Sequence, residues 1–202
     1  LKGHKFCSEC GTRLAPASPR PAESARTERR QLTVLFYDMV GSTELSAALE
    51  PEDFRDAIAN FHAVAAEAVS PYDAFVAAHV GDGGIVYFGY PLAREDAAEC
   101  AVLSGLALID ATSRITLPNG KKVRVRVGIA TGTVVVGRVE DGDSGNSAVG
   151  QVTSLAARLQ SRAQPNQCVI ASRTLRLVGE LFQTEDLGLV DAKGFADGVQ
   201  AF

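Results

Sequence analysis

Asp38 is the first residue whose type and position suit chemistry. It follows the apolar run Leu32 to Tyr37, and the chain then breaks at Gly41 before Ser42 and Thr43 begin a helical pattern. A buried strand that ends on a carboxylate, followed by a glycine turn and a helix start, can hold a metal ion beside a phosphate. The spacing therefore predicts that Asp38 is a metal ligand and that Gly41, Ser42 and Thr43 bind phosphate.

A second acid, Asp82, lies between two glycines in the segment 75–88, FVAAHVGDGGIVYF. Two β-prone runs joined by Gly-Asp-Gly predict a hairpin with Asp82 at its tip. Asp-Gly also occurs in hairpins for conformational reasons alone, and that alternative stays open for Asp82.

If the hairpin lies beside the strand that ends at Asp38, the two carboxylates meet, and they repel unless a cation lies between them. Hard oxygen ligands favour Mg²⁺ or Mn²⁺, and two such ions suit attack on a phosphoryl group. Arg126 lies on segment 121–129, in which apolar and basic residues alternate. It is predicted to contact the triphosphate that carries this phosphoryl group.

The remaining elements follow from apolar periodicity and breaker residues. Helical spacing runs through 44–69 with a break near Pro51, and His62 in this stretch is assigned to packing or to the surface. The other predicted elements are a helix over 91–109, strands over 121–129 and 134–139 joined by a turn at 131–132, a helix over 150–164, a strand over 168–171, a helix over 172–178 and a glycine-punctuated tail over 187–202. This order predicts an α+β sandwich of the ferredoxin-like type, with helices packed on an antiparallel sheet.

Composition narrows the class of protein. The chain has 202 residues, 46% of them hydrophobic, and a net charge of −4, which does not suggest a general nucleic-acid or membrane-surface binder. No apolar stretch approaches the roughly 20 residues that span a bilayer, no signal peptide is visible, and the cysteines do not form a secreted disulfide pattern. We expect a cytoplasmic protein, and the start at Leu1 leads us to expect a fragment of a longer one.

Residues 1–14 contain Cys7 and Cys10 in a Cys-x-x-Cys-Gly pattern, which is half of a zinc knuckle. Tetrahedral zinc needs four ligands and only His4 is nearby, so the predicted partner is a second pair upstream of Leu1. An unliganded N-terminal stub is the open alternative. Residues 15–30, rich in Pro, Ala, Ser and Arg, are predicted to be a linker, which leaves 31–202 as the main domain.

Four segments together resemble the catalytic domain of the class III adenylate/guanylate cyclases, in the bacterial branch similar to soluble adenylyl cyclase. They are FYDMVGST, FVAAHVGDGGIVYFGYP, VRVGIATG and AVG followed by LAARLQ, and the resemblance covers about 29–202. It implies that Asp38 and Asp82 hold two metal ions per active site, that Arg158 is the transition-state arginine and that Arg126 contacts pyrophosphate.

The same resemblance implies that ATP or GTP is converted into a 3′,5′-cyclic nucleotide and pyrophosphate. It also implies a head-to-tail homodimer with two active sites, each using residues of both protomers. The cysteine pair and the linker resemble the zinc-ribbon lead-in of multidomain members, which often continue into an ATPase and a helical-repeat region.

Three positions depart from the family pattern. Ala78 stands where relatives have a lysine that reads the purine, Ser147 where they have Asp or Thr, and Ser154 where they have an asparagine that orients the ribose. Three hypotheses follow: a weak cyclase with relaxed base specificity, a pseudo-cyclase that binds nucleotide or dimerises to regulate a neighbouring domain, and a heterodimer partner that lends Asp38 and Asp82 to a complete protomer.

Overall fold

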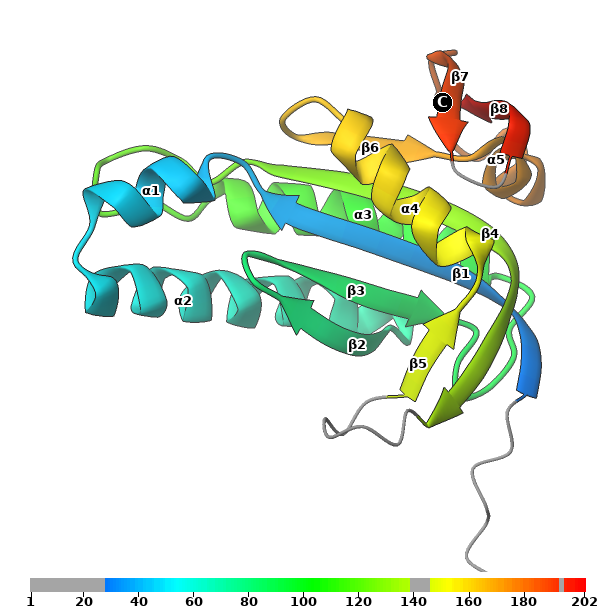
Figure 1. Ribbon diagram of the computed structural model, residues 1–202, viewed down its shortest axis with the longest axis horizontal. Helices are drawn as coiled ribbons and strands as arrows, with labels where there is room; N and C mark the ends of the chain where they lie inside the picture. Colours follow the sequence, from blue (N-terminus) through cyan, green and yellow to red (C-terminus); the bar gives the residue numbers. More distant parts are fainter. Residues whose placement is uncertain (1–27, 139–145, 193–194) are drawn as a thin grey trace, which may run out of the picture.

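The computed structural model describes residues 28–138, 146–192 and 195–202. Within them, a six-stranded mixed sheet has the order β2-β3-β1-β4-β5, and β6 also pairs with β4 (Figure 1). Its strands are β1 (Glu28–Met39), β2 (Phe75–Val80), β3 (Gly83–Phe88), β4 (Val125–Arg138), β5 (Asn146–Val149) and β6 (Gln167–Ile170). A separate hairpin consists of β7 (Gly188–Ala192) and β8 (Phe195–Ala201).

Strand β1 is central because both of its faces are apolar. Leu32 and Val34 pack in the core on one face of the sheet, and Leu35, Tyr37 and Met39 pack in the core on the other. Such a strand is stable only between two neighbours and two layers, since it has no solvent-facing side. It pairs antiparallel with β3 on one edge and with β4 on the other.

Helices cover both faces of this sheet (Figure 1). Helices α1 (Ser42–Ala48), α2 (Pro51–Val69) and α3 (Ala97–Ser113) lie on the Tyr37 side, and α4 (Gln151–Arg162) lies on the Leu32 side. The short elements η1 (Ser70–Tyr72) and α5 (Ser172–Val178) complete the described chain. The expected break near Pro51 is confirmed, because this proline occupies the first turn of α2.

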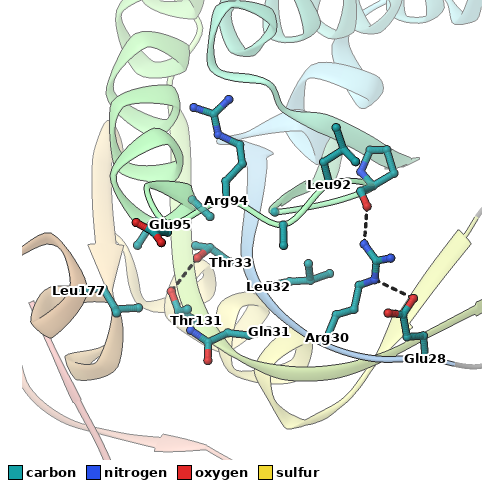
Figure 2. Close-up of a pocket in the computed structure, with 15 residues that line it drawn as sticks. Glu28, Arg30, Gln31, Leu32, Thr33, Leu92, Arg94, Glu95, Thr131 and Leu177 are labelled. Carbon is teal, nitrogen blue, oxygen red and sulfur yellow. Dashed lines mark hydrogen bonds and ion pairs between the residues drawn. The ribbon is translucent and has the colours of Figure 1, made fainter.

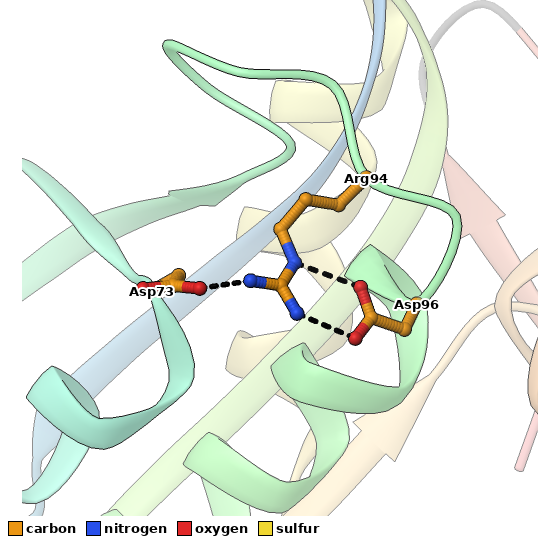
Figure 3. A network of polar contacts seen from close by, with 3 residues as sticks. All are labelled: Asp73, Arg94 and Asp96. Carbon is orange, nitrogen blue, oxygen red and sulfur yellow. Dashed lines mark hydrogen bonds and ion pairs between the residues drawn. The ribbon is translucent and has the colours of Figure 1, made fainter.

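Helix α3 begins six residues later than the sequence predicts, because the preceding loop has polar contacts of its own. Arg94 donates from Nε and Nη2 to the carboxylate of Asp96, at 2.8 and 2.6 Å, and also pairs with Asp73 (Figure 3). The guanidinium lowers the pKa of Asp96 to about 2. The loop therefore connects α3 to the end of η1 before the helix starts.

The fold class is confirmed, two details of the prediction are wrong, and one hairpin was not predicted. The expected turn at 131–132 is absent, because Thr131 and Gly132 pair with Thr33 and Leu32 inside the β1–β4 ladder and β4 is continuous. The sheet is not wholly antiparallel, because α4 carries the chain back so that β6 runs parallel to β4. The glycine-punctuated tail at 187–202, for which no strands were predicted, forms the β7–β8 hairpin.

The predicted knuckle at Cys7 and Cys10 lies outside the described residues, and strand β1 begins at Glu28, three residues before the predicted start of the main domain. Across 28–138, 146–192 and 195–202, no helix has the length and apolar character that crossing a membrane requires.

Gly83 permits the close approach of β3 to β1. A Cβ at this position would lie 2.2 Å from the carbonyl oxygen of Tyr37 and 3.1 Å from the Cα of Asp38. These are backbone atoms, so they cannot turn aside as a flexible side chain would. The glycine is therefore required for the pairing that brings Asp82 beside Asp38.

We expect Gly83→Ala to destabilise the fold by about 2–3 kcal/mol, in the upper part of the overpacking range, because strand backbone must move. Gly81→Ala is the matched control: this glycine has φ +59° and no atom within 4 Å of an added Cβ, so only left-handed strain of about 1 kcal/mol applies. Urea unfolding of both variants measures the difference. Equal losses would contradict the steric account.

Candidate active site

Asp38 lies one residue before the end of β1 and is flanked by a residue from each neighbouring strand. In the ladders it is opposite Gly83 of β3 and opposite Arg126 of β4. Arg126 donates from Nε and Nη2 to the two carboxylate oxygens of Asp38, at 3.0 and 2.6 Å. The Arg126 side chain is 32% exposed and the Asp38 side chain 24%, so water partly screens this two-pronged ion pair.

Asp82 is at the tip of the β2–β3 hairpin and is bonded to both β1 and α1. Its carbonyl oxygen accepts a hydrogen bond from the backbone N–H of Met39 at 3.0 Å, and its carboxylate accepts one from the hydroxyl of Ser42. The fold thus brings Asp38, Asp82, Ser42 and Arg126 to the same end of the sheet. The Ser42 contact links Asp82 to a separate element, which the hairpin turn alone does not require.

The donor set at this end suits a hard cation. One carboxylate comes from β1 and the other from the β2–β3 turn, and the described residues contain no group of three or more His, Cys, Asp or Glu that could enclose a metal by themselves. Mg²⁺ is commonly held by one or two carboxylates, with water and substrate phosphates completing its coordination. Asp38 and Asp82 therefore fit Mg²⁺ or Mn²⁺ that binds together with a phosphate ligand.

An open hollow of about 480 Å³ adjoins Asp82 between α1, α2 and the hairpin turn. Its wall includes Ser42 and Thr43 at the start of α1 and Ile58 of α2. Gly41, immediately before α1, has φ +79° and provides the turn that the sequence predicts. Polar groups together with the apolar side chains of Phe54 and Ile58 give this hollow the mixed character of a ligand site.

The predicted Arg158 and Ser154 do not join the acids. Helix α4 buries Leu155 and Leu159, so Ser154 and Arg158 lie one turn apart on its exposed face. Arg158 Nε donates to the carbonyl oxygen of Asp191 in β7, at 3.1 Å. Among the described residues, no hydrogen bond or ion pair links either side chain to Asp38 or Asp82.

The other two predicted base-site positions have different outcomes. Ala78 is exposed on β2, beside a register shift, and pairs with Ile85, which in turn is opposite Phe36 of β1. The row formed by Phe36, Ile85 and Ala78 lies on the same face of the sheet as Asp38, because Phe36 is two residues before Asp38 in β1. Ser147 is in β5, where its backbone pairs with Gly137, and its side chain lies outside the described part.

His62 is a residue of this region that the sequence prediction missed. Its Nε2 lies 3.0 Å from the carbonyl oxygen of Gly81, the residue before Asp82, and its ring lies 4.2 Å from that of His79. Ile58, one helical turn earlier, lines the hollow beside Asp82. The sequence does show that Ile58 and His62 are four residues apart, which places both on the same face of a helix. It does not show that this face packs against the β2–β3 hairpin.

A larger hollow of about 560 Å³ lies at the opposite end of β1 (Figure 2). Its cations have partners already: Arg30 contacts Glu28 and the carbonyl oxygen of Pro91, and Arg94 belongs to the loop described above. The buried hydroxyls of Thr33 and Thr131 bond to each other at 2.9 Å on its wall. We place the chemistry at the Asp38 end instead, because Asp38 and Asp82 meet there beside the start of α1.

Comparison with known proteins identifies the family. Residues 25–202 match the protein family described as "Adenylate and Guanylate cyclase catalytic domain". The chain belongs to this family. The resemblance of the four sequence segments is thereby confirmed for the catalytic domain, whereas the zinc ribbon stays a prediction.

The cyclase domain is also similar to individual known proteins. An uncharacterized protein of Rhizobium meliloti (strain 1021) is 32% identical over 188 residues, which cover 91% of this chain and 18% of that protein. The crystal structure of the adenylyl cyclase CyaB from P. aeruginosa is 30% identical with a TM-score of 0.78, and the match covers 87% of this chain and 94% of the other. That of the guanylyl cyclase Cya2 is 27% identical with a TM-score of 0.80, covering 87% and 91%. The chain thus spans less than a fifth of this curated relative and nearly all of the two solved domains.

We expect the stability of the cyclase domain to fall with acidification through His79. Burial and the neighbouring His62 lower the pKa of His79 from its usual 6.5, so the folded state binds the proton less readily than the unfolded state. Stability is therefore present above pH 6.5 and declines as the pH falls from there to the lowered value. Melting temperatures from about pH 7.5 to 5 measure the slope, and His79→Gln should flatten it. An unchanged slope in the variant would contradict this assignment.

Proposed function

We propose that the cyclase domain converts ATP into 3′,5′-cyclic AMP and pyrophosphate, with GTP as the alternative substrate. The observation that carries this proposal is the meeting of Asp38 and Asp82 at one end of the sheet, with Arg126 beside them. The 3′-oxygen of the ribose attacks the α-phosphorus and loses its proton, and the bond between the α- and β-phosphates breaks to release pyrophosphate. Family membership and the match to an adenylyl cyclase structure support this choice.

The residues divide the work by their chemistry. Asp38 and Asp82 hold two Mg²⁺ or Mn²⁺ ions, which when bound supply charge stabilisation at the phosphates. Arg126 exchanges its bond to Asp38 for a bond to the terminal phosphates, since a guanidinium binds either anion in the same two-pronged way. Gly41, Ser42 and Thr43 provide further phosphate contacts from the turn before α1.

A second protomer completes the site in this proposal. Arg158, the proposed transition-state arginine, is exposed and bonded to the backbone of β7, so it meets the phosphates of a neighbouring copy rather than its own. In the described part of the chain, no helix covers the β2–β3 side of the sheet face on which α4 packs (Figure 1). Phe36, Ala77 and Ile85 are half-buried on that face. This apolar area supports a head-to-tail homodimer, with a heterodimer as the variant in which a complete partner supplies lysine and asparagine.

Base recognition is expected to be weak. Ala78 is exposed and has no polar atom with which to read a purine, and the short hydroxyl of Ser154 replaces an amide. A missing contact to a polar base edge costs about 1–3 kcal/mol. We therefore propose slow turnover with relaxed preference between ATP and GTP.

The wider setting is proposed on the same basis. Because the chain spans 18% of its curated relative, we propose that the domain works inside a longer cytoplasmic signalling protein. Zinc at Cys7 and Cys10, completed by ligands upstream, would belong to that longer protein, as would an ATPase or helical-repeat region.

We expect purified protein with Mn²⁺ to form cyclic AMP from ATP, and cyclic GMP from GTP at a comparable rate, as measured by mass spectrometry. Asp38→Asn should abolish product, because the amide keeps the shape of the carboxylate but loses the charge that holds the cation. Asp56→Asn is the matched control, because this acid is at an exposed position of α2 and, within the described residues, its hydrogen bonds and ion pair go to the adjacent Arg55. No product at high protein concentration would contradict the enzyme proposal, and retained nucleotide binding by calorimetry would then support a pseudo-cyclase.

We expect Arg126→Gln to change metal and nucleotide binding in opposite directions. Without nucleotide, Mn²⁺ should bind up to about fivefold more tightly, because the partly exposed ion pair no longer competes for Asp38. Triphosphate affinity should fall by about tenfold or more, because a charge-assisted contact is lost. Calorimetry measures both, with Arg124→Gln as the exposed control on the neighbouring position. Weakening of both affinities would contradict the exchange of partners.

A further inference from the structure

We propose that His62 is a positioning residue for the cation site, acting through the Gly81–Asp82 turn. This inference rests on the proposed function, since it concerns the same pair of acids. His62 belongs to α2 and does not itself supply a ligand to the site. Its role is to fix the backbone from which the Asp82 carboxylate extends.

The contact fixes the tautomer of His62. Its Nε2 lies 3.0 Å from the carbonyl oxygen of Gly81, and a carbonyl oxygen can only accept, so Nε2 carries the hydrogen. The other ring nitrogen, Nδ1, is buried and has no partner among the described residues. A hydrogen on Nδ1 would be buried without an acceptor, whereas a hydrogen on Nε2 is accepted by the carbonyl oxygen of Gly81.

The ring of His62 is also confined from its sides. The His79 ring lies with its centroid 4.2 Å away, and the Phe61 ring lies 5.5 Å away on the helix side. Phe61 is fully buried and packs against Tyr37 of β1 at 5.9 Å. The imidazole therefore projects toward the hairpin turn from a rigid part of the core.

The Asp82 turn needs such support because little else restrains it. Gly81 has φ +59° and no atom within 4 Å of an added Cβ, so one side of the turn lies open. Met39 bonds the Asp82 carbonyl and Ser42 bonds its carboxylate, from β1 and α1 respectively. The bond from His62 adds α2 as the third element that holds the turn. Without it the Asp82 carboxylate can move relative to Asp38, and a two-carboxylate cation site depends on their separation.

Two substitutions separate the hydrogen bond from packing. The amide nitrogen of Gln can reach the place of Nε2 and donate to Gly81, whereas the shorter Asn places its nitrogen near Nδ1. We expect His62→Gln to bind Mn²⁺, measured by electron paramagnetic resonance without nucleotide, within about twofold of wild type. His62→Asn should bind about five- to tenfold more weakly, the effect of one lost hydrogen bond.

The outcomes distinguish this inference from the proposed function. If wild type binds no Mn²⁺, the proposed cation site fails and the positioning role fails with it. If wild type binds Mn²⁺ and His62→Asn binds it equally well, or if both variants lose the same affinity, only the positioning role is overturned. Melting temperatures report any general loss of stability. If His62 only packed, both variants would lose stability and Gln would not restore Mn²⁺ binding. The ¹⁵N shifts of His62 in wild type give a test without a variant: a hydrogen on Nε2 supports the inference, and one on Nδ1 overturns it.

Discussion

The pairing of β1 with a strand on each side is the constraint on which the site depends. Asp38 is held between Gly83 and Arg126 because the two antiparallel ladders fix its neighbours residue by residue. A shift of one residue in either ladder would turn side chains to the opposite face. The apolar residues on both faces of β1 oppose such a shift, so the core that stabilises the sheet also sets the position of the acid.

Charge is balanced locally in the structure. The carboxylate of Asp38 is paired with Arg126 and that of Asp82 accepts a hydroxyl from Ser42. In the proposed function, a cation that binds between the acids competes with these partners, and the guanidinium of Arg126 that it releases is free to bind the proposed phosphate ligand. Cation and phosphate binding are therefore linked in this proposal.

The residues proposed for the active site are divided between two groups that the protomer keeps apart. The acids and Arg126 lie at the end of β1, whereas Ser154 and Arg158 lie on the exposed face of α4. Helix α4 is seated tightly on β4, where a Cβ at Gly128 would lie 2.1 Å from the backbone nitrogen of Gln160. It therefore cannot slide toward the acids without disrupting the sheet, and a second copy is the simplest way to join the two groups.

Local sequence patterns determined much of this protein. The apolar run before Asp38, the Gly-Asp-Gly turn and the break at Pro51 were sufficient for strand, hairpin and helices, since each depends on near neighbours in the chain. They did not reveal that β4 continues through Gly132, because that pairing is made with β1.

Partner choice was decided only by the tertiary structure. Arg126 bonds Asp38 across 88 positions of sequence, and His62 reaches Gly81 because α2 packs under the hairpin. Such contacts depend on how the layers assemble, and no periodicity within one element encodes them. The sequence by itself therefore determined which residues are candidates for the chemistry, and the fold decided which of these candidates lie together.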